Sequence, residues 1–374
     1  MKHLRILQLN YSSSAIGGTE RNLIEYADQF TKLGHYVLTC SLHKKQGDLA
    51  DELIRRNLPF LSLGFSFPWK LHRLLDLVKL VHQNHFDVIN IYGFKITVLT
   101  TLLLKLSGSH VIVSGLDGTD DWRRPYHVAL ESFAYPFIGG WIAVSNNVKE
   151  VFMKRERIVG EKIKVIHCAV NTNILSPRLK EKSAEIRARL KISPDIFIIG
   201  NTSVIKPFKG HVDILKALRM LKDKNVRFKC IFVGKDHLHG KIQAIATKLG
   251  LKDDIIFTGF VENLYDIVPV FDLYVSASLV EGLSVAMLEA MALGLPIIVT
   301  PVGGTLEVVN DGENGLITRV KKPTILFEKI FELVNNPVKR KMLGDNASKK
   351  IRKEFSLETK VQEKLNYFYS LLKK

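Results

Sequence analysis

Two glutamates eight positions apart, Glu281 and Glu289, bound the segment EGLSVAMLE. The apolar run Leu273–Ser276 just before it predicts a buried strand. Ser284 is the predicted N-cap of a helix that ends before the next Gly-Leu-Pro turn. A helix that begins where a parallel strand ends favours phosphate, because its unpaired N–H groups and its dipole attract an anion, and Gly282 lets a ligand approach the backbone. The segment therefore predicts a phosphate-binding site.

The two carboxylates suit a ligand that carries hydroxyl groups, since carboxylates accept hydrogen bonds. Glutamates taken alone are more often solvated charges at helix ends. Glu289, however, stands among methionine, leucine and alanine residues, where an unpaired carboxylate is costly to bury. We therefore expect Glu289 to have a partner, and Glu281, in the loop before the helix, to reach the same crevice.

A second cluster, IKPFKGH, contains two lysines after the predicted strand Ile196–Gly200. Lys206 and Lys209 place two cations at the carboxyl end of that strand, which suits a diphosphate. The alternative is that both lysines are solvated charges of a loop, the usual situation for isolated lysines.

A third feature is the pair Gly17 and Gly18, between the predicted strand Leu4–Leu9 and the first helix. Two glycines in a loop most often only form a turn. Their spacing is not the Gly-x-Gly-x-x-Gly of a dinucleotide site, which argues against a dehydrogenase.

These features lie in a chain that alternates short β-branched runs with longer amphipathic stretches, the rhythm of parallel α/β sheets. A length of 374 residues favours two domains of ordinary size. The composition becomes charged between Pro177 and Leu190, so we place a linker at about 168–192. The predicted fold class is α/β, with Rossmann-like, doubly wound domains over residues 1–170 and 171–352.

The segment EGLSVAMLEAMALGLPIIVTPVGGTLEVVNDGENG resembles the signature of glycosyltransferase family 4, whose members are retaining enzymes of the GT-B fold. The resemblance extends to residues 6–27, to most of 192–320 and, more weakly, to 141–177, about two thirds of the chain. It implies two domains facing a central cleft, with residues 353–374 forming a terminal helix that crosses back to the first domain. It also implies a hexosyltransferase-type enzyme whose donor substrate is a nucleotide sugar.

The resemblance carries over to individual residues of this chain. The implied donor-binding residues are Gly17, Gly18, Lys206, Lys209, Glu281, Gly282, Leu283, Ser284 and Glu289. Glu289 would hold the ribose hydroxyls, while Glu281 and the three residues after it would hold the donor sugar and diphosphate. Lys206, where many members carry arginine, and Lys209 would neutralise the leaving diphosphate. With Glu281 they are the catalytic candidates, and we expect neither a metal nor a cofactor to be required.

Two departures from the family concern the acceptor side. Many members carry a histidine after the strand that is here His110–Ser114, but this chain continues with Gly-Leu-Asp-Gly-Thr-Asp. If an acidic side chain takes that place, Asp117 or Asp120 is the candidate, and Asp117 joins the catalytic candidates. The alternative is that both cap a turn or a helix. Residues Ile166–Asn171 also differ from the usual Asn-Gly-Val-Asp, so we expect different acceptor contacts.

The chain carries 54 basic and 37 acidic residues, a net charge of +17. Such an excess suits nucleic acid or an acidic membrane surface. Residues 65–85 predict a basic amphipathic helix that can lie on an anionic bilayer, the alternative being a helix packed on its own sheet. The lysines, arginine and tryptophan of this helix are Trp69, Lys70, Arg73 and Lys79.

Three widely spaced cysteines without a Cys-x-x-Cys pair favour a reducing compartment and argue against structural zinc. No stretch approaches the roughly 18 apolar residues of a membrane-spanning helix. The expected location is therefore the cytoplasm, with peripheral association at the inner face of the cytoplasmic membrane.

The expected function is retaining transfer of a sugar, from a UDP- or GDP-linked donor, to a glycan or lipid-linked acceptor in bacterial surface polysaccharide biosynthesis. One alternative is a nucleotide-sugar 2-epimerase, which shares the two-domain cleft but not the EGLSVAMLE segment. Another is a basic nucleic-acid-binding protein, but no recognisable binding motif accompanies the charge, so nucleic acid is not expected as a partner.

Overall fold

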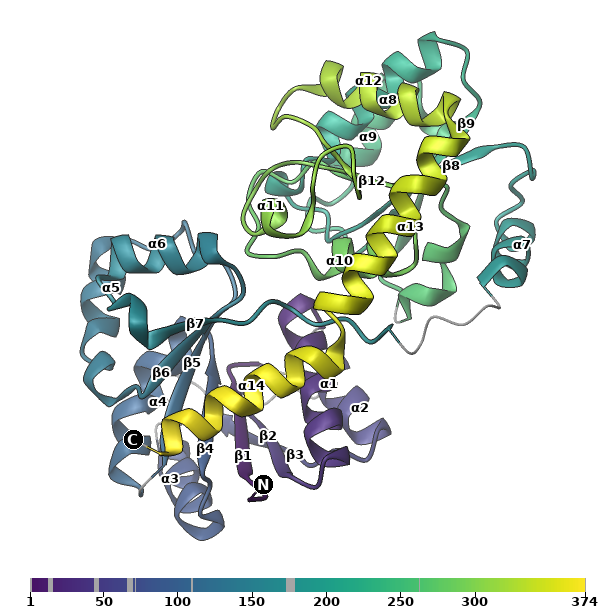
Figure 1. Cartoon of the computed structure of the whole chain (residues 1–374). Helices are drawn as coiled ribbons and strands as arrows, with labels where there is room; N and C mark the ends of the chain where they lie inside the picture. Colours follow the sequence, from purple (N-terminus) through teal and green to yellow (C-terminus); the bar gives the residue numbers. More distant parts are fainter. Residues whose placement is uncertain are drawn as a thin grey trace. The chain divides into compact units, whose positions relative to one another are not determined.

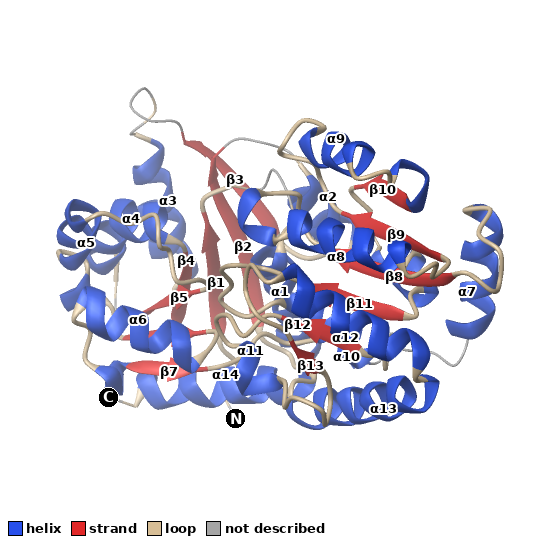
Figure 2. Ribbon diagram, turned by 90° about the horizontal axis from the view of Figure 1, so that it is seen from above, coloured by secondary structure: helices blue, strands red, loops and turns tan. Residues whose placement is uncertain are grey.

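The computed structural model describes residues 2–12, 16–43, 47–65, 70, 72–108, 110–172, 179–261 and 263–373. The chain forms two compact units, here called unit 1 (Met1–Ala169 and Leu357–Lys374) and unit 2 (Val170–Ser356). Each is built on one parallel sheet with helices on both faces, as Figure 2 shows for each unit. The α/β, doubly wound architecture predicted from the alternating pattern is thus confirmed.

Unit 1 contains a seven-stranded sheet in the order β3-β2-β1-β4-β5-β6-β7. Its strands are β1 (Arg5–Asn10), β2 (Tyr36–His43), β3 (Phe60–Phe65), β4 (Val88–Tyr92), β5 (Val111–Leu116), β6 (Gly140–Ala143) and β7 (Ile163–Val165). Its helices are α1 (Gly18–Lys32), α2 (Asp48–Arg55), α3 (Arg73–Asn84), α4 (Phe94–Leu106), α5 (Pro125–Ser132), α6 (Asn146–Glu156) and α14 (Leu357–Leu372). The central strands are mostly apolar because helices bury both of their faces, although β1 and β4 include the buried polar residues Gln8 and Asn90.

Unit 2 contains a six-stranded sheet in the order β10-β9-β8-β11-β12-β13. Its strands are β8 (Phe197–Thr202), β9 (Phe228–Val233), β10 (Ile255–Gly259), β11 (Leu273–Ser276), β12 (Ile297–Val299) and β13 (Leu316–Ile317). Its helices are α7 (Leu179–Arg189), α8 (His211–Asp223), α9 (Lys241–Lys248), α10 (Val285–Ala292), α11 (Thr305–Val308), α12 (Pro323–Asn335) and α13 (Pro337–Glu354).

The terminal helix α14 packs on unit 1, as the resemblance implied. Its buried residues Leu357, Val361, Leu365 and Phe368 belong to the same apolar core as β1, α1 and β4. The rings of Phe368 and Phe30 of α1 lie 6.2 Å apart, and Figure 1 shows α14 in yellow alongside α1. Residues of the two ends of the chain therefore complete one core.

Two segments differ from their sequence-based interpretation. The predicted linker contains helix α7, in which Ile186 is buried and Arg187 pairs with Asp272 of unit 2 at 2.9 Å. The charged residues of α7 therefore hold this helix on unit 2, whereas the sequence pattern predicts a linker there. The predicted basic helix at 65–85 is described from Arg73 as α3, whereas Trp69 lies outside the described residues.

Candidate functional site

The strand order of unit 2 reverses between β8 and β11, which are neighbours in the sheet although β9 and β10 separate them in the sequence. Parallel α/β sheets bind ligands at the carboxyl ends of strands where the order reverses. The loops that follow these two strands contain both predicted donor motifs. They are joined directly, because the Leu279 backbone N–H donates to the Phe208 carbonyl at 2.7 Å.

An ion pair lies at the centre of this loop cluster. The Lys209 Nζ and Glu281 Oε1 atoms are 2.6 Å apart, and both side chains are largely buried. The Ser278 hydroxyl donates to the same carboxylate oxygen at 2.8 Å. The structure thus brings together two residues that were predicted from separate motifs, and the carboxylate holds the lysine at the sheet edge.

Two glycines allow the loops to approach this closely. Gly210 has φ +72, and a Cβ atom there would lie 1.9 Å from the Ala277 carbonyl oxygen. Gly303 has φ +56, and its Cβ would lie 2.2 Å from the Glu281 carbonyl oxygen. Any other residue at either position would have to adopt the left-handed region and displace the loop that carries Glu281.

Helix α10 begins at the predicted position. Ser284 is its N-cap, and the Ser284 hydroxyl accepts from the Met287 backbone N–H at 3.2 Å. Glu289 is buried in this helix. Burial raises the pKa of Tyr274, whose hydroxyl lies beside Thr202 and Ser284, and the charges of Glu281 and Glu289 raise it further. The charges of the two glutamates therefore both act on one buried phenol.

Lys206 takes a different position from Lys209. It precedes the short 3₁₀ turn Pro207–Lys209 in extended conformation. The Lys206 amine lies 6.0 Å from the centre of the Phe208 ring and the Lys209 amine 5.7 Å. The two lysines therefore border one aromatic ring, while the described ion pair with Glu281 involves Lys209.

Unit 1 has its own reversal of strand order, between β1 and β4. Gly17 follows β1 as the N-cap of α1, and Gly18 is the first residue of that helix. The Gly17 N–H donates to the Glu20 carboxylate at 2.9 Å. The glycine pair thus forms a helix N-terminus at the edge where a ligand of this sheet is expected.

Asp117 lies beside this N-terminus, in the loop that follows β5. Burial raises the pKa of its carboxyl to about 6, and the nearby charges of Glu20 and Asp120 add to that shift. The positive charge of Lys364 and a hydrogen bond with Thr19 act in the opposite direction. Asp117 is therefore brought together with the glycine pair.

Asp120 has a structural engagement of its own. Its carboxylate pairs with the Arg123 guanidinium at 2.7 Å and accepts from the Trp122 indole N–H at 3.3 Å. These contacts hold the turn that leads into α5, as the turn interpretation of Asp120 would require.

Protein-family comparison decides the identity of the chain. Residues 182–350 match the family model described as "Glycosyl transferases group 1". Residues 16–174 match the model described as "Glycosyltransferase Family 4". The two matches cover the loops described above in both units.

The chain belongs to the glycosyltransferases.

Individual glycosyltransferases resemble it over different lengths. The putative glycosyltransferase EpsD of Bacillus subtilis is 27% identical over 52% of this chain and 51% of its own length. The chain matches about half or less of the length of EpsD and of two other curated relatives. An Escherichia coli enzyme named UDP-Gal:alpha-D-GlcNAc-diphosphoundecaprenol alpha-1,3-galactosyltransferase is 22% identical over 87% of this chain and 86% of its own.

A solved glycosyltransferase structure has the same fold. HepE of Anabaena, in complex with UDP-glucose, superposes with a TM-score of 0.87 at 22% identity, covering 98% of this chain and 100% of HepE. At this identity the likeness establishes the fold alone.

Sequence reasoning missed one charged neighbour of Asp117, the candidate residue in unit 1 of this glycosyltransferase. Lys364 of α14 is buried and donates to the Tyr92 hydroxyl at 2.9 Å, with its amine 4.2 Å from the centre of the Tyr26 ring. Burial lowers its pKa to about 8, whereas Asp117 and Cys168 raise it. The sequence contains a signal for the burial of Lys364, because Lys364 lies at helical spacing from Val361 and Phe368, on the inward face of α14.

Burial raises the pKa of the Cys168 thiol to about 12, which keeps the thiol protonated at neutral pH. No group of three or more His, Cys, Asp or Glu side chains suited to a metal ion occurs among the described residues. No described helix has the length and apolar character needed to cross a bilayer.

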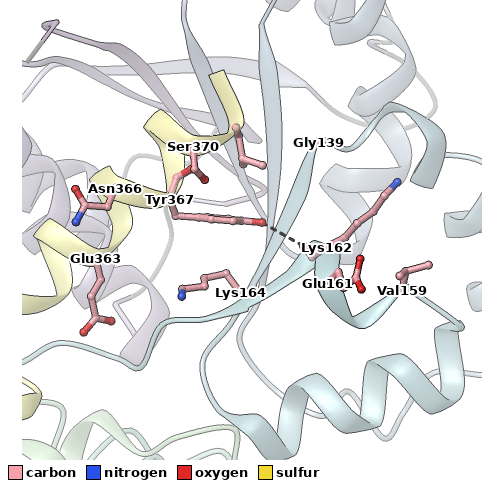
Figure 3. A pocket seen from close by; sticks show the side chains of 10 residues that line it. Gly139, Val159, Glu161, Lys162, Lys164, Glu363, Asn366, Tyr367 and Ser370 are labelled. Atoms are coloured by element: carbon pink, nitrogen blue, oxygen red, sulfur yellow. Dashed lines mark hydrogen bonds between the residues drawn. The ribbon is translucent and has the colours of Figure 1, made fainter. Parts of the chain in front are cut away.

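A cavity of about 730 Å³ lies elsewhere in unit 1, between the sheet edge at β7 and helix α14. Figure 3 shows Lys164 and Glu363 among its lining side chains, and the Tyr367 hydroxyl donating to the Lys162 carbonyl at 3.1 Å. Its lining contains none of the predicted site residues.

Proposed function

We propose that the protein is a retaining glycosyltransferase that moves a sugar from a UDP- or GDP-linked donor to a glycan or lipid-linked acceptor in bacterial surface polysaccharide biosynthesis. The observation that carries the proposal is the Lys209–Glu281 pair, 2.6 Å apart, at the point where the strand order of unit 2 reverses. This is where a parallel sheet offers helix N-termini and cations to a diphosphate.

In this proposal the two ends of the donor meet different groups. The diphosphate lies at the N-terminus of α10, where the backbone of Leu283 and Ser284 and the two lysines neutralise its charge. Glu289 accepts hydrogen bonds from the ribose hydroxyls. Glu281 orients Lys209 and holds hydroxyls of the donor sugar. Because Lys209 is already held by a carboxylate, its charge is in place before the diphosphate arrives, which reduces the reorganisation needed during reaction.

We further propose that departure of the diphosphate requires no divalent metal. Lys206, Lys209 and the α10 N-terminus supply the stabilisation that a metal would otherwise give to the leaving group. Initial rates in EDTA and in added Mg²⁺ should then be equal. A loss of turnover in EDTA that Mg²⁺ restores would remove this part of the proposal.

The acceptor side is assigned to unit 1, where Asp117 is the candidate acceptor-side residue. The support for a lipid-linked acceptor is the Escherichia coli relative, whose name specifies a diphosphoundecaprenol acceptor. The support for a surface polysaccharide is a second relative, the capsular polysaccharide biosynthesis glycosyltransferase CapM of Staphylococcus aureus, 23% identical over 61% of this chain. Peripheral association with the inner face of the cytoplasmic membrane fits such an acceptor.

The deciding experiment is a thermal-shift screen against UDP, GDP, ADP and their sugars, because a ligand that binds only the folded state raises the unfolding temperature. One nucleotide should stabilise the wild type at millimolar concentration and fail to stabilise Glu289→Ala. The matched control is Glu328→Ala, which removes an exposed glutamate from α12 of the same unit. If no nucleotide stabilises folded wild-type protein, the proposed function is wrong.

The stereochemical part has a separate test. Once the donor is known, proton NMR of the product reports the anomeric configuration through the coupling constant of the anomeric proton. Retention from an α-linked donor gives an α-linked product, and a β-linked product would refute the retaining mechanism.

A further inference from the structure

Helices α4 and α5 of unit 1 lie side by side (Figures 1 and 2). Large apolar side chains on and beside them are exposed. On the helices these are Leu102 (53% exposed), Leu106 (78%), Tyr126 (66%) and Leu130 (50%), with Trp122 (54%) just before α5 and Phe133 (77%) just after it. Isolated exposed apolar residues are normal, but a contiguous group marks an interaction site. We call these six residues the α4–α5 surface.

The outer face of α5 carries apolar side chains where a surface helix usually carries charges. Tyr126, Leu130 and Phe133 follow one another at helical spacing, with the small Ala129 and Ser132 also exposed. The helix's single acidic residue, Glu131, is on the opposite side and is buried. The exposed side of α5 is therefore apolar, the reverse of a helix that only covers a sheet.

Charged contacts beneath α5 explain this orientation. Arg123 is buried and bonds the carboxylates of both Glu131 and Glu156, the latter at 3.2 Å. The Tyr135 hydroxyl donates to Glu156 at 2.8 Å. These ionic contacts fix the polar side of α5 against the protein, so its apolar side has to face outward.

The cations around the α4–α5 surface indicate the charge of the partner. Lys95 and Lys105 on α4 are exposed, as is Arg124 just before α5. Helix α4 contains no acidic residue, and Asp121 is the exposed acid nearest to the α5 face in the sequence. Exposed aromatic and leucine side chains next to lysine and arginine are the composition of a surface that inserts shallowly into an anionic bilayer.

Over its described part, Arg73–Asn84, the helix predicted from sequence to contact a membrane has the apolar residues of its inner side covered. In α3 the apolar residues Leu74, Leu77 and Val81 are buried against the rest of unit 1. The apolar side of α3 is thus already covered, whereas that of α5 is not.

We propose that the α4–α5 surface binds an anionic lipid bilayer. The surface continues to the end of the sheet that carries the candidate acceptor residues, because the Phe94 ring at the start of α4 lies 5.7 Å from the Trp122 ring and 5.3 Å from the His127 ring. Trp122 in turn bonds Asp120, three residues after Asp117. Contact with a bilayer would therefore bring lipid-linked acceptors to this edge, a consequence that rests on the proposed function.

The test is co-sedimentation of the 374-residue chain with two kinds of vesicle at about 0.1 M salt. One kind is phosphatidylcholine alone, and the other is phosphatidylcholine with about 30% phosphatidylglycerol. The variant Tyr126→Ser with Phe133→Ser should reduce partition into anionic vesicles by about tenfold or more, because binding strength follows the buried apolar area. Its unfolding temperature should not change, since both side chains are exposed. The variant Lys95→Glu with Lys105→Glu should weaken binding to anionic vesicles only.

Matched controls remove equally exposed apolar side chains elsewhere. Leu75→Ser on α3 and Val338→Ser in unit 2 should bind vesicles like the wild type. Wild-type protein that stays in the supernatant, or a Tyr126→Ser with Phe133→Ser variant that binds fully, would overturn the proposal. So would sedimentation velocity showing that this variant turns a dimer into a monomer, because the surface would then serve a second copy of the chain.

Nucleotide stabilisation separates this proposal from the proposed function. The α4–α5 variants should retain the thermal shift of the wild type with its nucleotide, because they leave unit 2 unaltered. Vesicle binding without any nucleotide effect would support the membrane surface and refute the proposed function. A nucleotide effect without vesicle binding would support the proposed function and refute the membrane surface.

Discussion

Replacing Lys364 by methionine should move the acidic limb of the activity profile to higher pH. Burial raises the pKa of Asp117 to about 6, and the Lys364 charge is the largest influence that opposes this rise. An opposite charge within about 4–6 Å lowers a carboxyl pKa by about 1–3 units, so losing the charge should raise the Asp117 pKa by a similar amount. The ionised carboxylate then forms only at higher pH.

The size of the effect follows from the titration. With a pKa of about 6, roughly nine tenths of Asp117 is ionised at pH 7. A rise of about 1–3 units lowers that fraction to between about one half and one hundredth, so kcat/KM at pH 7 should fall by about 2- to 100-fold. Activity should return at alkaline pH, because the carboxyl still ionises there.

The assay is nucleotide release from the identified donor, measured as kcat/KM between pH 5 and pH 9.5. Lys360→Met is the matched control, because Lys360 is another buried lysine of α14 but pairs with Glu363, at 2.8 Å. Asp117→Asn should lack the acidic limb altogether. If the Lys364→Met profile overlays that of the wild type, Lys364 does not keep Asp117 ionised and the reasoning is refuted.

Three further changes have calculable outcomes. Gly240 is in a left-handed conformation with open space around it, so Gly240→Ala should lower the free energy of unfolding by about 1–2 kcal/mol. Gly210→Ala should lower it clearly more in urea denaturation, because its Cβ would lie 1.9 Å from the Ala277 carbonyl oxygen. Equal losses in the two variants would contradict the packing argument. Burial and the Lys209 charge lower the pKa of His211 to about 4. The unfolded state therefore binds a proton more tightly, and the free energy of unfolding should fall by up to about 3 kcal/mol as the pH drops from about 6.5 towards 4. The urea midpoint of His211→Gln should be less sensitive to pH in that range. Lys209→Met should reduce kcat/KM by about 100-fold or more, with partial recovery in Lys209→Arg, and an unchanged rate would show that Lys209 is not part of the reaction.

The local elements of the donor motif could be predicted because their signals are local. The apolar run of β11, the cap at Ser284 and the glycine turns each act over a few residues. The contact between Lys209 and Glu281 could not be predicted in the same way. It depends on β8 lying next to β11, a pairing of strands distant in the sequence that only the assembled sheet reveals.

The features missed from sequence depend on which side of a helix faces inward. In α5 the spacing of Tyr126, Leu130 and Phe133 is what a buried face would show, and only the buried Arg123 and Glu131 reveal that this helix is turned the other way. The position of Lys364 beside Asp117 likewise required knowing that α14 returns to unit 1. Periodicity identifies the faces of a helix, but the tertiary partners decide which of them is covered.

The return of α14 to unit 1 also has a consequence for biosynthesis on the ribosome. The core of unit 1 includes Phe368, which is synthesised about 200 residues after Ala169, the last residue of the unit's first segment. At about 5–20 residues per second, the interval is on the order of tens of seconds. During that time the face of α1 that contacts Phe368 is uncovered, whereas all of unit 2 emerges as one uninterrupted segment. Unit 2 can thus complete its core during translation, while the nascent unit 1 must wait for its final helix and is the part of the chain that a chaperone would have to protect.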